Sequence, residues 1–208
     1  MLIEERIADY LEIAASDAPA PGGGSVVALC GALGAAMTEM VCNLTVGKEK
    51  YKDEEERMRR ILAETTALRR ELEAAVDEDA AAYRAFMDAM ALPKDTAAEK
   101  EARTQAMQEA LKGATLTPLG AAKSAAKILP LAKEVLAHGN QNAYSDAVVS
   151  ALLARTAVIG SLQNVRINLP SVRDEGFVAD VRAQMAALEE SAIRLEGEIL
   201  KEAREQGD

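Results

Sequence analysis

Apolar residues recur every three or four positions along most of the chain, which is the spacing of one face of an α-helix. The longest such series lies within residues 53–92 and consists of Met58, Ile61, Thr65, Leu68, Leu72, Val76, Tyr83, Phe86 and Met90. We expect further helices over residues 2–16, 26–46 and 174–205, one from residue 97 towards Gly113, one over 118–137 and one from the polar turn 140–146 to Asn168. The sequence therefore predicts an all-α protein.

Residues 26–46 are apolar on every side of the expected helix and are rich in Ala and Gly. A soluble helix of this kind is buried on all sides, because it offers no polar face to water. The segment is also just long enough to cross a bilayer, but Glu39 and Asn43 are costly in lipid. We expect a multihelical bundle in which this central, buried Ala/Gly-rich helix is surrounded by the others, with no membrane span. Residues 1–208 form one domain, since no long linker divides them.

Several residues mark where the helices begin and end. The segment 17–25 contains Pro19, Pro21 and three glycines, which break a helix, and Ser25 is a good N-cap for the next one. Pro118 predicts a kink or a restart. Thr96 and Glu99 form a capping-box pattern, and Asn142 or Ser145 can cap the helix that follows. Gly139 is expected in the left-handed conformation that often ends a helix.

The composition supports this fold class and excludes some functions. The chain contains 42 alanines, only 3% aromatic residues and a formal net charge of −10, so nucleic acid is not an expected partner. Cys30 and Cys42 lie twelve positions apart on one helix, about 18 Å by the helical rise, and cannot bridge each other. Free cysteines favour a reducing cytoplasm. Neither cysteine is flanked by a histidine or another cysteine, so we expect no metal site.

Four features carry candidate chemistry, and each also has a purely structural interpretation. Asp79 falls on an apolar seam, where it is either a structural cap or ion-pair partner or a functional acid with a raised pKa. Lys48 and Lys50 are either a solvated helix end or an anion site, and His138 is more typical of a helix end than of a catalyst. The polar and small residues between Asp146 and Asn168 line either a groove or a hydrogen-bonded helix contact.

Several segments in order resemble one known family, the cyclodeaminase/cyclohydrolase family of tetrahydrofolate enzymes. The resemblance covers roughly residues 1–205. It is carried by Pro21-Gly-Gly-Gly-Ser25, Asn43-Leu-Thr-Val-Gly47-Lys48-Glu-Lys50-Tyr51, Val76-Asp77-Glu-Asp79, Leu92-Pro93-Lys94, Gly139-Asn140 with Ser145-Asp146, and Asn164-Val-Arg166-Ile-Asn168. The Asn43-Leu-Thr segment is closer to the stand-alone members, which slightly favours cyclohydrolase over cyclodeaminase.

The resemblance implies an all-helical homodimer with a folate site between helices near the dimer interface. The implied reactions are hydrolysis of 5,10-methenyltetrahydrofolate to 10-formyltetrahydrofolate, or cyclodeamination of 5-formiminotetrahydrofolate to the methenyl compound and ammonia. Folate, including polyglutamylated forms, is the substrate, and neither reaction requires a metal or redox cofactor. Two alternatives remain: a non-catalytic folate-binding protein and a structural helical protein.

The chemistry of these reactions assigns roles to the matching residues. Both reactions move protons near a cationic carbon, which suits buried carboxylates, and the catalytic candidates are Asp79, Asp146 and Asp77. The expected site also contains N–H groups at a helix start, which can bind an anion or a carbonyl group. Lysines would bind the glutamate tail, and asparagine amides would bond the pterin. The residues expected to bind substrate are Gly22, Gly23, Gly24, Ser25, Asn43, Lys48, Lys50, Asn140, Ser145 and Asn164, with Lys123 and Lys127 as further candidates for the tail.

Overall fold

The computed structural model describes the backbone of residues 1–207 and the side chains up to residue 205. Over this range the chain contains helices and no strand, so the expected all-α fold is confirmed. The α-helices are α1 (Ile7–Ala14), α2 (Gly23–Thr45), α3 (Glu55–Ala91), α4 (Ala97–His138), α5 (Tyr144–Asn168) and α6 (Glu175–Gly207). Short 3₁₀ helices are η1 (Leu2–Glu4), η2 (Glu49–Glu54), η3 (Gln141–Ala143) and η4 (Leu169–Ser171).

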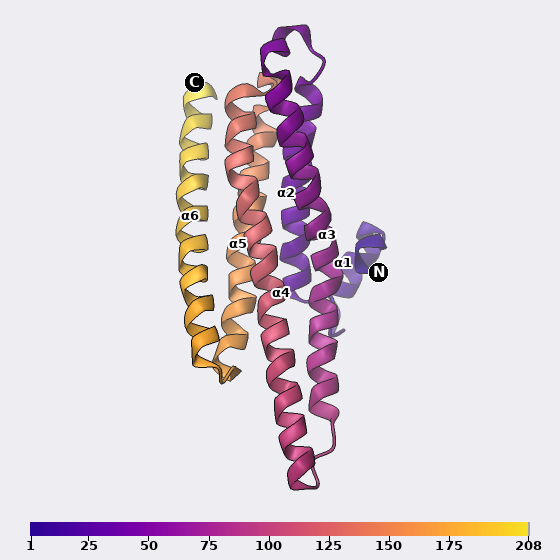
Figure 1. The fold of residues 1–208 in the computed structure, drawn as a ribbon. Helices are drawn as coiled ribbons and strands as arrows, with labels where there is room; N and C mark the ends of the chain where they lie inside the picture. The colour runs from indigo at the N-terminus through magenta and orange to yellow at the C-terminus, as the bar shows by residue number, and fades with distance from the viewer. Residues whose placement is uncertain (208) are drawn as a thin grey trace.

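The long helices run up and down beside one another (Figure 1). Helix α2 packs against α3, α4 and α5, whereas α6 packs against α5 and α4 at one edge and α1 lies near the opposite edge. Helices α3 and α4 are longer than their neighbours, and the hairpin that joins them projects beyond the ends of α2 and α5 (Figure 1). The start of α2 and the end of α5 therefore lie part of the way along the side of this hairpin.

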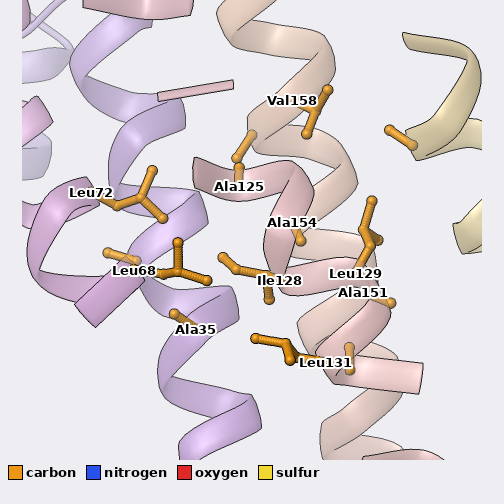
Figure 2. Packing of buried hydrophobic residues seen from close by; sticks show 14 of the residues in the cluster. Ala35, Leu68, Leu72, Ala125, Ile128, Leu129, Leu131, Ala151, Ala154 and Val158 are labelled. Carbon is orange, nitrogen blue, oxygen red and sulfur yellow. The ribbon is translucent and has the colours of Figure 1, made fainter. Parts of the chain in front are cut away.

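The core consists of small side chains on α2 and α5 packed against larger ones on α3 and α4. Ala35 faces Leu68 and Leu72 of α3, while Ala151 and Ala154 of α5 lie next to the leucine and isoleucine side chains of α4 (Figure 2). A small residue lets two helix backbones approach closely, because no side chain separates them. The predicted packing of Ala28, Gly31 and Ala35 inside the bundle is confirmed, since all three are buried.

The expectation that α2 is covered on all sides is wrong for the single chain. Val26, Leu33, Met40 and Leu44 lie on an uncovered side of α2 and are between 37% and 48% exposed. Helix α2 and the stretch 141–171 are both long and apolar enough to cross a membrane, but about half of each is buried inside the bundle, as for core helices. The side of α2 that carries small residues thus belongs to the core, whereas the side that carries bulkier residues is exposed to solvent in the single chain.

Several helix boundaries differ from those expected. Helix α2 begins at Gly23, with Gly22 as its N-cap and no side-chain cap, so Ser25 is not the cap but the third helical residue. Helix α4 is continuous through Pro118, because tertiary packing outweighs the local cost of a buried proline. Gly139 has φ −80° and ψ −173°, which is extended backbone and not the expected left-handed conformation. His138 lies in the last turn of α4, as expected, and its ring nitrogen Nδ1 is 3.3 Å from a carboxylate oxygen of Glu54.

The ends of the chain and the start of α5 also differ. Residues 2–16 form a 3₁₀ turn and then α1, not one helix, because Asp77 accepts hydrogen bonds from the start of the chain. Neither Asn142 nor Ser145 caps α5, which has Ala143 as its N-cap without a side-chain bond. The capping box of Thr96 and Glu99 is confirmed. The single domain over residues 1–208 remains a prediction, and Asp208 lies outside the described residues.

The close contacts of α2 predict what larger residues do there. A β-carbon at position 34 would lie 3.1 Å from the carbonyl oxygen of Ser150 and 3.2 Å from the nitrogen of Ala154, both backbone atoms. At position 31 it would lie 3.1 Å from two methyl carbons of the flexible Leu72 side chain and 3.2 Å from the β-carbon of Ala157. We expect Gly34→Leu to lower the free energy of unfolding by ~1–3 kcal/mol or more, and Gly31→Leu by less, because Leu72 can move.

Urea denaturation followed by circular dichroism measures both effects. The matched control is Gly113→Leu on α4, where a β-carbon would meet nothing within 4 Å. Because leucine is the better helix former, the control should be neutral or slightly stabilising. Equal destabilisation at positions 34 and 113 would contradict the role of close packing.

Candidate functional site

A cleft of about 320 Å³ lies where α2 begins. The segment before α2 forms one wall, and α3, α4 and α5 form the others. Its lining residues are Pro19, Ala20, Gly22, Gly23, Gly24, Asp79, Ala80, Ala82, Tyr83, Phe86, Leu111, Ala114, Asn164, Ile167 and Asn168. This volume is at the lower end of the range of small-molecule sites, and the mixture of aromatic, apolar and few polar side chains is typical of them.

The Asp79 carboxylate is held against the first turn of α2 by Ser25. The backbone N–H of Ser25 donates to Asp79 Oδ2 at 3.0 Å, and the Ser25 hydroxyl reaches the same oxygen at 3.2 Å. The carbonyl oxygen of Val76 lies 2.8 Å from the same hydroxyl, so the two acceptors share its single proton. Asp79 therefore caps a helix other than its own, and its second oxygen, Oδ1, receives none of these bonds.

Glycine at position 24 makes this contact possible. A β-carbon on Gly24 would lie only 2.0 Å from Asp79 Oδ1 and 2.5 Å from its carboxyl carbon. The carboxylate therefore occupies the space that any other side chain would fill. At Gly22, two residues earlier in the chain, a β-carbon would meet nothing within 4 Å. Of the three consecutive glycines, Gly24 is the one that the placement of the Asp79 carboxylate requires.

The surroundings of Asp79 have two opposing effects on the pKa of its carboxyl group. Burial raises the pKa of the carboxyl above its ordinary value, and the two Ser25 hydrogen bonds oppose this without cancelling it. No lysine or arginine is among the residues that line the cleft. A carboxylate of raised pKa without a cationic partner is typical of acid–base sites and of sites that bind a cation.

Neutral polar groups complete the cleft. Gly23 and Gly24 line the cavity, and their N–H groups, the first of α2, have no partner within the helix. Asn164 donates its side-chain N–H to the carbonyl of Gly160, and Asn168 donates to that of Ala114, both at 2.9 Å. Each amide thereby leaves its own oxygen free to accept from a ligand. The site offers N–H donors on one side and amide oxygens on the other.

Sequence reasoning placed Asp79, Asn164 and the three glycines in the site, and the structure brings them together. Asn168, which the sequence placed on the same possible groove line as Asn164 but not among the substrate-binding candidates, also lines the cleft. Sequence reasoning assigned Tyr83 and Phe86 only to the apolar face of α3, whereas they line the cleft. Aromatic residues next to an isolated acid on one helix face were the available signal.

Asp77 lies outside the cleft and has a structural partner. Its Oδ1 accepts a hydrogen bond from the N–H of Leu2 at 2.7 Å, and its Oδ2 accepts a longer one from Ile3. These bonds fasten the N-terminal turn to α3. Because two positions on a helix point in nearly opposite directions, Asp77 faces α1 and η1 while Asp79 faces the cleft.

The remaining candidates lie at the other end of the bundle. Asp146 is in the first turn of α5, where a carboxylate interacts favourably with the helix dipole. It lies eighteen residues from Asn164, about 27 Å along the helix. Within one chain, Asp146 and Asp79 do not form a carboxylate pair.

The other residues at this end are exposed or held by local contacts. Asn140 bonds the hydroxyl of Thr45, the carbonyl of Leu44 and the N–H of Asn142, so it joins α2 to α5. Lys50 lies over the ring of Tyr51, with 5.2 Å between the ammonium and the ring centre. Four of the residues expected to bind substrate are exposed to solvent at this end: Asn43, Lys48, Lys50 and Ser145. Lys123 and Lys127 are exposed on α4 and do not line the cleft.

Cys30 and Cys42 are both free thiols, as the helix spacing predicts. Burial raises the pKa of the Cys42 thiol to about 12, so it stays protonated and unreactive. In the described part of the chain, no three His, Cys, Asp or Glu side chains gather in a way that would hold a metal ion. The expectation that no metal takes part stays a prediction.

Fold and cleft together define an all-helical protein with a cleft built around a carboxylate at the start of its central helix. The chain belongs to the formiminotransferase-cyclodeaminase family, whose sequence profile matches residues 6–187. The resemblance seen in the sequence is thereby confirmed.

Relatives and a solved structure agree with this assignment. A methenyltetrahydrofolate cyclohydrolase of Methylorubrum extorquens is 40% identical over 88% of both chains. The formimidoyltransferase-cyclodeaminase of Sus scrofa is 37% identical over 92% of this chain, which spans 35% of that longer protein. The crystal structure of formiminotetrahydrofolate cyclodeaminase from Thermotoga maritima superposes with a TM-score of 0.88, at 25% identity over 98% of both chains.

Proposed function

We propose that this protein is a tetrahydrofolate one-carbon enzyme that hydrolyses 5,10-methenyltetrahydrofolate to 10-formyltetrahydrofolate in the Asp79 cleft. The observation that carries the proposal is a half-buried carboxylate of raised pKa in a cleft lined by no cationic side chain. The methenyl bridge of the substrate is a cationic amidinium, which such a cleft attracts. The matching length of the cyclohydrolase relative supports hydrolysis as the main reaction.

The groups around the cleft match the parts of this substrate. The amide oxygens of Asn164 and Asn168 accept hydrogen bonds from N–H groups of the pterin, which presents both donors and acceptors. The rings of Tyr83 and Phe86 provide an apolar wall for the flat parts of the molecule. Asp79 lies beside the bridging carbon in this arrangement.

Hydrolysis then proceeds with Asp79 as the proton acceptor. Water attacks the methenyl carbon while Asp79 takes its proton, which gives a neutral tetrahedral centre bearing a hydroxyl. The N–H groups of Gly23 and Gly24 bind the oxygen as its charge grows during collapse. Asp79 then gives its proton to N5 as the carbon–N5 bond breaks, the hydroxyl proton is released to water as the carbonyl forms, and the formyl group remains on N10. The reaction transfers protons only and requires no redox cofactor.

Cyclodeamination is the second candidate, because the solved relative and the longer animal relatives carry that name. In it, N10 attacks the formimino carbon, ammonia leaves and the same methenyl compound forms. The same acid and the same cationic product are involved, so one cleft serves both reactions. A non-catalytic folate-binding protein would bind these folates without turnover.

The methenyl chromophore provides the test of function. We expect purified protein to remove the absorbance of 5,10-methenyltetrahydrofolate, and Asp79→Asn to slow turnover by ~10²–10⁴-fold while folate affinity and fold survive. Asparagine keeps the shape and still caps α2. Because Asp79 must be ionised to accept a proton, the rate should rise with pH through its raised pKa.

The control for this test is Asp88→Asn, which removes an exposed carboxylate from the same helix. It should leave turnover unchanged. Full activity in Asp79→Asn, measured per folded molecule, would contradict the catalytic role. Formation of the chromophore from 5-formiminotetrahydrofolate would identify cyclodeamination, and binding without any turnover would identify a non-catalytic protein.

A second prediction uses the glycines to move Asp79 without changing it. In Gly24→Ala the new methyl occupies the position of the carboxylate, which must rotate away from Ser25. We expect turnover to fall by about 10²-fold, since a misplacement near 1 Å has effects of this size. Gly113→Ala on α4, outside the cleft, has open space and should retain near-normal turnover. Equal rates in both alanine variants would contradict the need for Asp79 at this place.

We also propose that the protein is a homodimer formed through the exposed apolar face of α2. Its exposed apolar residues are Val26, Leu33, Met40 and Leu44 on α2, with Val149 and Leu152 on α5. The only charged residue of α2, Glu39, is paired with Arg69 of α3 rather than presented on this face. A nearly uncharged face of this kind is typical of a subunit interface.

The spacing along α2 favours a two-fold axis near Leu33. Val26 and Met40 lie seven residues before and after it, so an antiparallel copy places Val26 of each chain on Met40 of the other. This arrangement brings the Lys48 and Lys50 end of one chain towards the cleft end of its partner. The two lysines then become candidates for binding the glutamate tail, including polyglutamylated forms, across the interface.

Leu33→Asp tests the dimer. Placing a charge at the centre of an apolar interface should convert the dimer to a monomer, as measured by light scattering at several concentrations. The matched control is Ile193→Asp on α6, because Ile193 is 49% exposed and Leu33 is 48% exposed. A monomeric wild type, or dissociation in both variants, would contradict this interface.

Two expectations about the protein's surroundings belong to the same proposal. Free thiols and a small metabolite as substrate fit a cytoplasmic enzyme. With a net charge of −10, nucleic acid is not an expected partner.

A further inference from the structure

An apolar strip leads from the cleft along the α3–α4 hairpin. Tyr83, Phe86 and Met90 lie four, seven and eleven residues after Asp79, so they follow it along one face of α3. Tyr83 and Phe86 line the cleft, whereas Met90 lies near the end of α3, where the hairpin projects beyond α2 and α5 (Figure 1). Tyr83 is 44% exposed and Met90 is 40% exposed. The strip therefore extends the apolar wall of the cleft along an open surface.

The far end of this strip carries an arginine from α4. The Nε–H of Arg103 donates to the carbonyl oxygen of Met90 at 2.9 Å. Arg103 lies eleven residues before Ala114, which lines the cleft, and three helical turns bring the two residues onto the same side of α4. The hydrogen bond and the spacing along both helices agree in placing the guanidinium at the end of the strip.

The charge of Arg103 is not neutralised by a carboxylate of the protein. In the described part of the chain the bond to Met90 is the only hydrogen bond of its side chain, and none of the ion pairs involves it. Glu99, one turn earlier on α4, accepts instead from the N–H groups of Asp95 and Thr96. Because Arg103 uses only Nε, its two terminal nitrogens remain able to donate to an anion.

We propose that Arg103 is a specificity-determining residue that binds a carboxylate of the substrate's glutamate tail, which leaves the cleft along the strip. The inference rests on the proposed function, because it takes a folate whose bridging carbon lies beside Asp79. Met90 lies about 16 Å beyond Asp79 along α3. Bond lengths put the first glutamate about 10 Å from the bridging carbon and each further γ-linked glutamate about 6 Å beyond it. The second glutamate therefore reaches Arg103.

This position suits an acidic protein that takes an acidic ligand. A net charge of −10 repels a tail of several carboxylates, and no lysine or arginine lines the cleft itself. The tail therefore needs a cation outside the cleft, at a distance that matches its length. Because Arg103 and the cleft belong to one chain, this contact requires no partner subunit, unlike the proposed contact of Lys48 and Lys50.

The test compares the binding of folates with one and with three glutamates. In Arg103→Gln the amide nitrogen takes the place of Nε, so the bond to Met90 is kept while the charged end is removed. We expect the dissociation constant of triglutamyl 5-formyltetrahydrofolate, measured by calorimetry, to rise about tenfold, the scale of one charge-assisted hydrogen bond. The constant of the monoglutamate should stay unchanged. The difference should shrink at high salt, which screens exposed charges.

The kinetics separate binding of the tail from chemistry. For triglutamyl 5,10-methenyltetrahydrofolate, Arg103→Gln should raise KM and leave kcat unchanged, because the lost contact is the same in the ground state and the transition state. Met90→Glu is a second variant, which places a carboxylate beside the guanidinium. It should weaken binding of the triglutamate and leave the monoglutamate unchanged.

The matched control is Arg84→Gln, which removes an exposed arginine of α3 that lies on another side of the helix from Asp79. It should alter neither constant. An unchanged triglutamate constant in Arg103→Gln, equal losses for both folates, or an equal loss in Arg84→Gln would overturn the inference. A wild type that prefers the triglutamate through Arg103 but turns over neither folate would contradict only the proposed reaction. A wild type that binds no folate would contradict both.

Discussion

The close approach of α2 to its neighbours is the constraint on which the rest of the structure depends. Gly31 and Gly34 face α3 and α5 with almost no free space, so these helices are held at a fixed short distance from α2. The same approach continues to the first turn, where Gly24 leaves room for a carboxylate instead of a methyl group. The packing that stabilises the bundle is also the packing that defines the cleft.

Asp79 shows how one contact serves both stability and chemistry. As the acceptor for the Ser25 N–H it replaces the missing N-cap of α2, since Gly22 has no side chain to do so. Burial meanwhile raises its pKa, so the ionised form is held at some cost. A group that both caps a helix and carries a raised pKa is kept in place by the fold and remains reactive. The structural and functional interpretations of Asp79 are therefore compatible.

The two ends of the bundle have different characters. The cleft end gathers neutral donors, amide oxygens and one carboxylate, whereas the opposite end carries Lys48, Lys50 and the polar join made by Asn140. Sequence motifs from both ends match the family, and the free apolar face of α2 runs between them. The antiparallel pair of chains proposed above would bring the two ends together at one site.

The sequence by itself determined the helical class, the buried small-residue side of α2, the capping box at Thr96 and the position of Asp79 on an apolar seam, because these follow from local spacing and side-chain chemistry. Only the tertiary structure decided that Ser25 bonds Asp79 instead of capping α2, that α4 continues through Pro118, and that Asp77 and Asp146 lie away from the cleft. These outcomes depend on contacts between residues about 50 to 75 positions apart, or on distances along a whole helix. Periodicity shows which face a residue occupies, but it contains no information about which other helix meets that face.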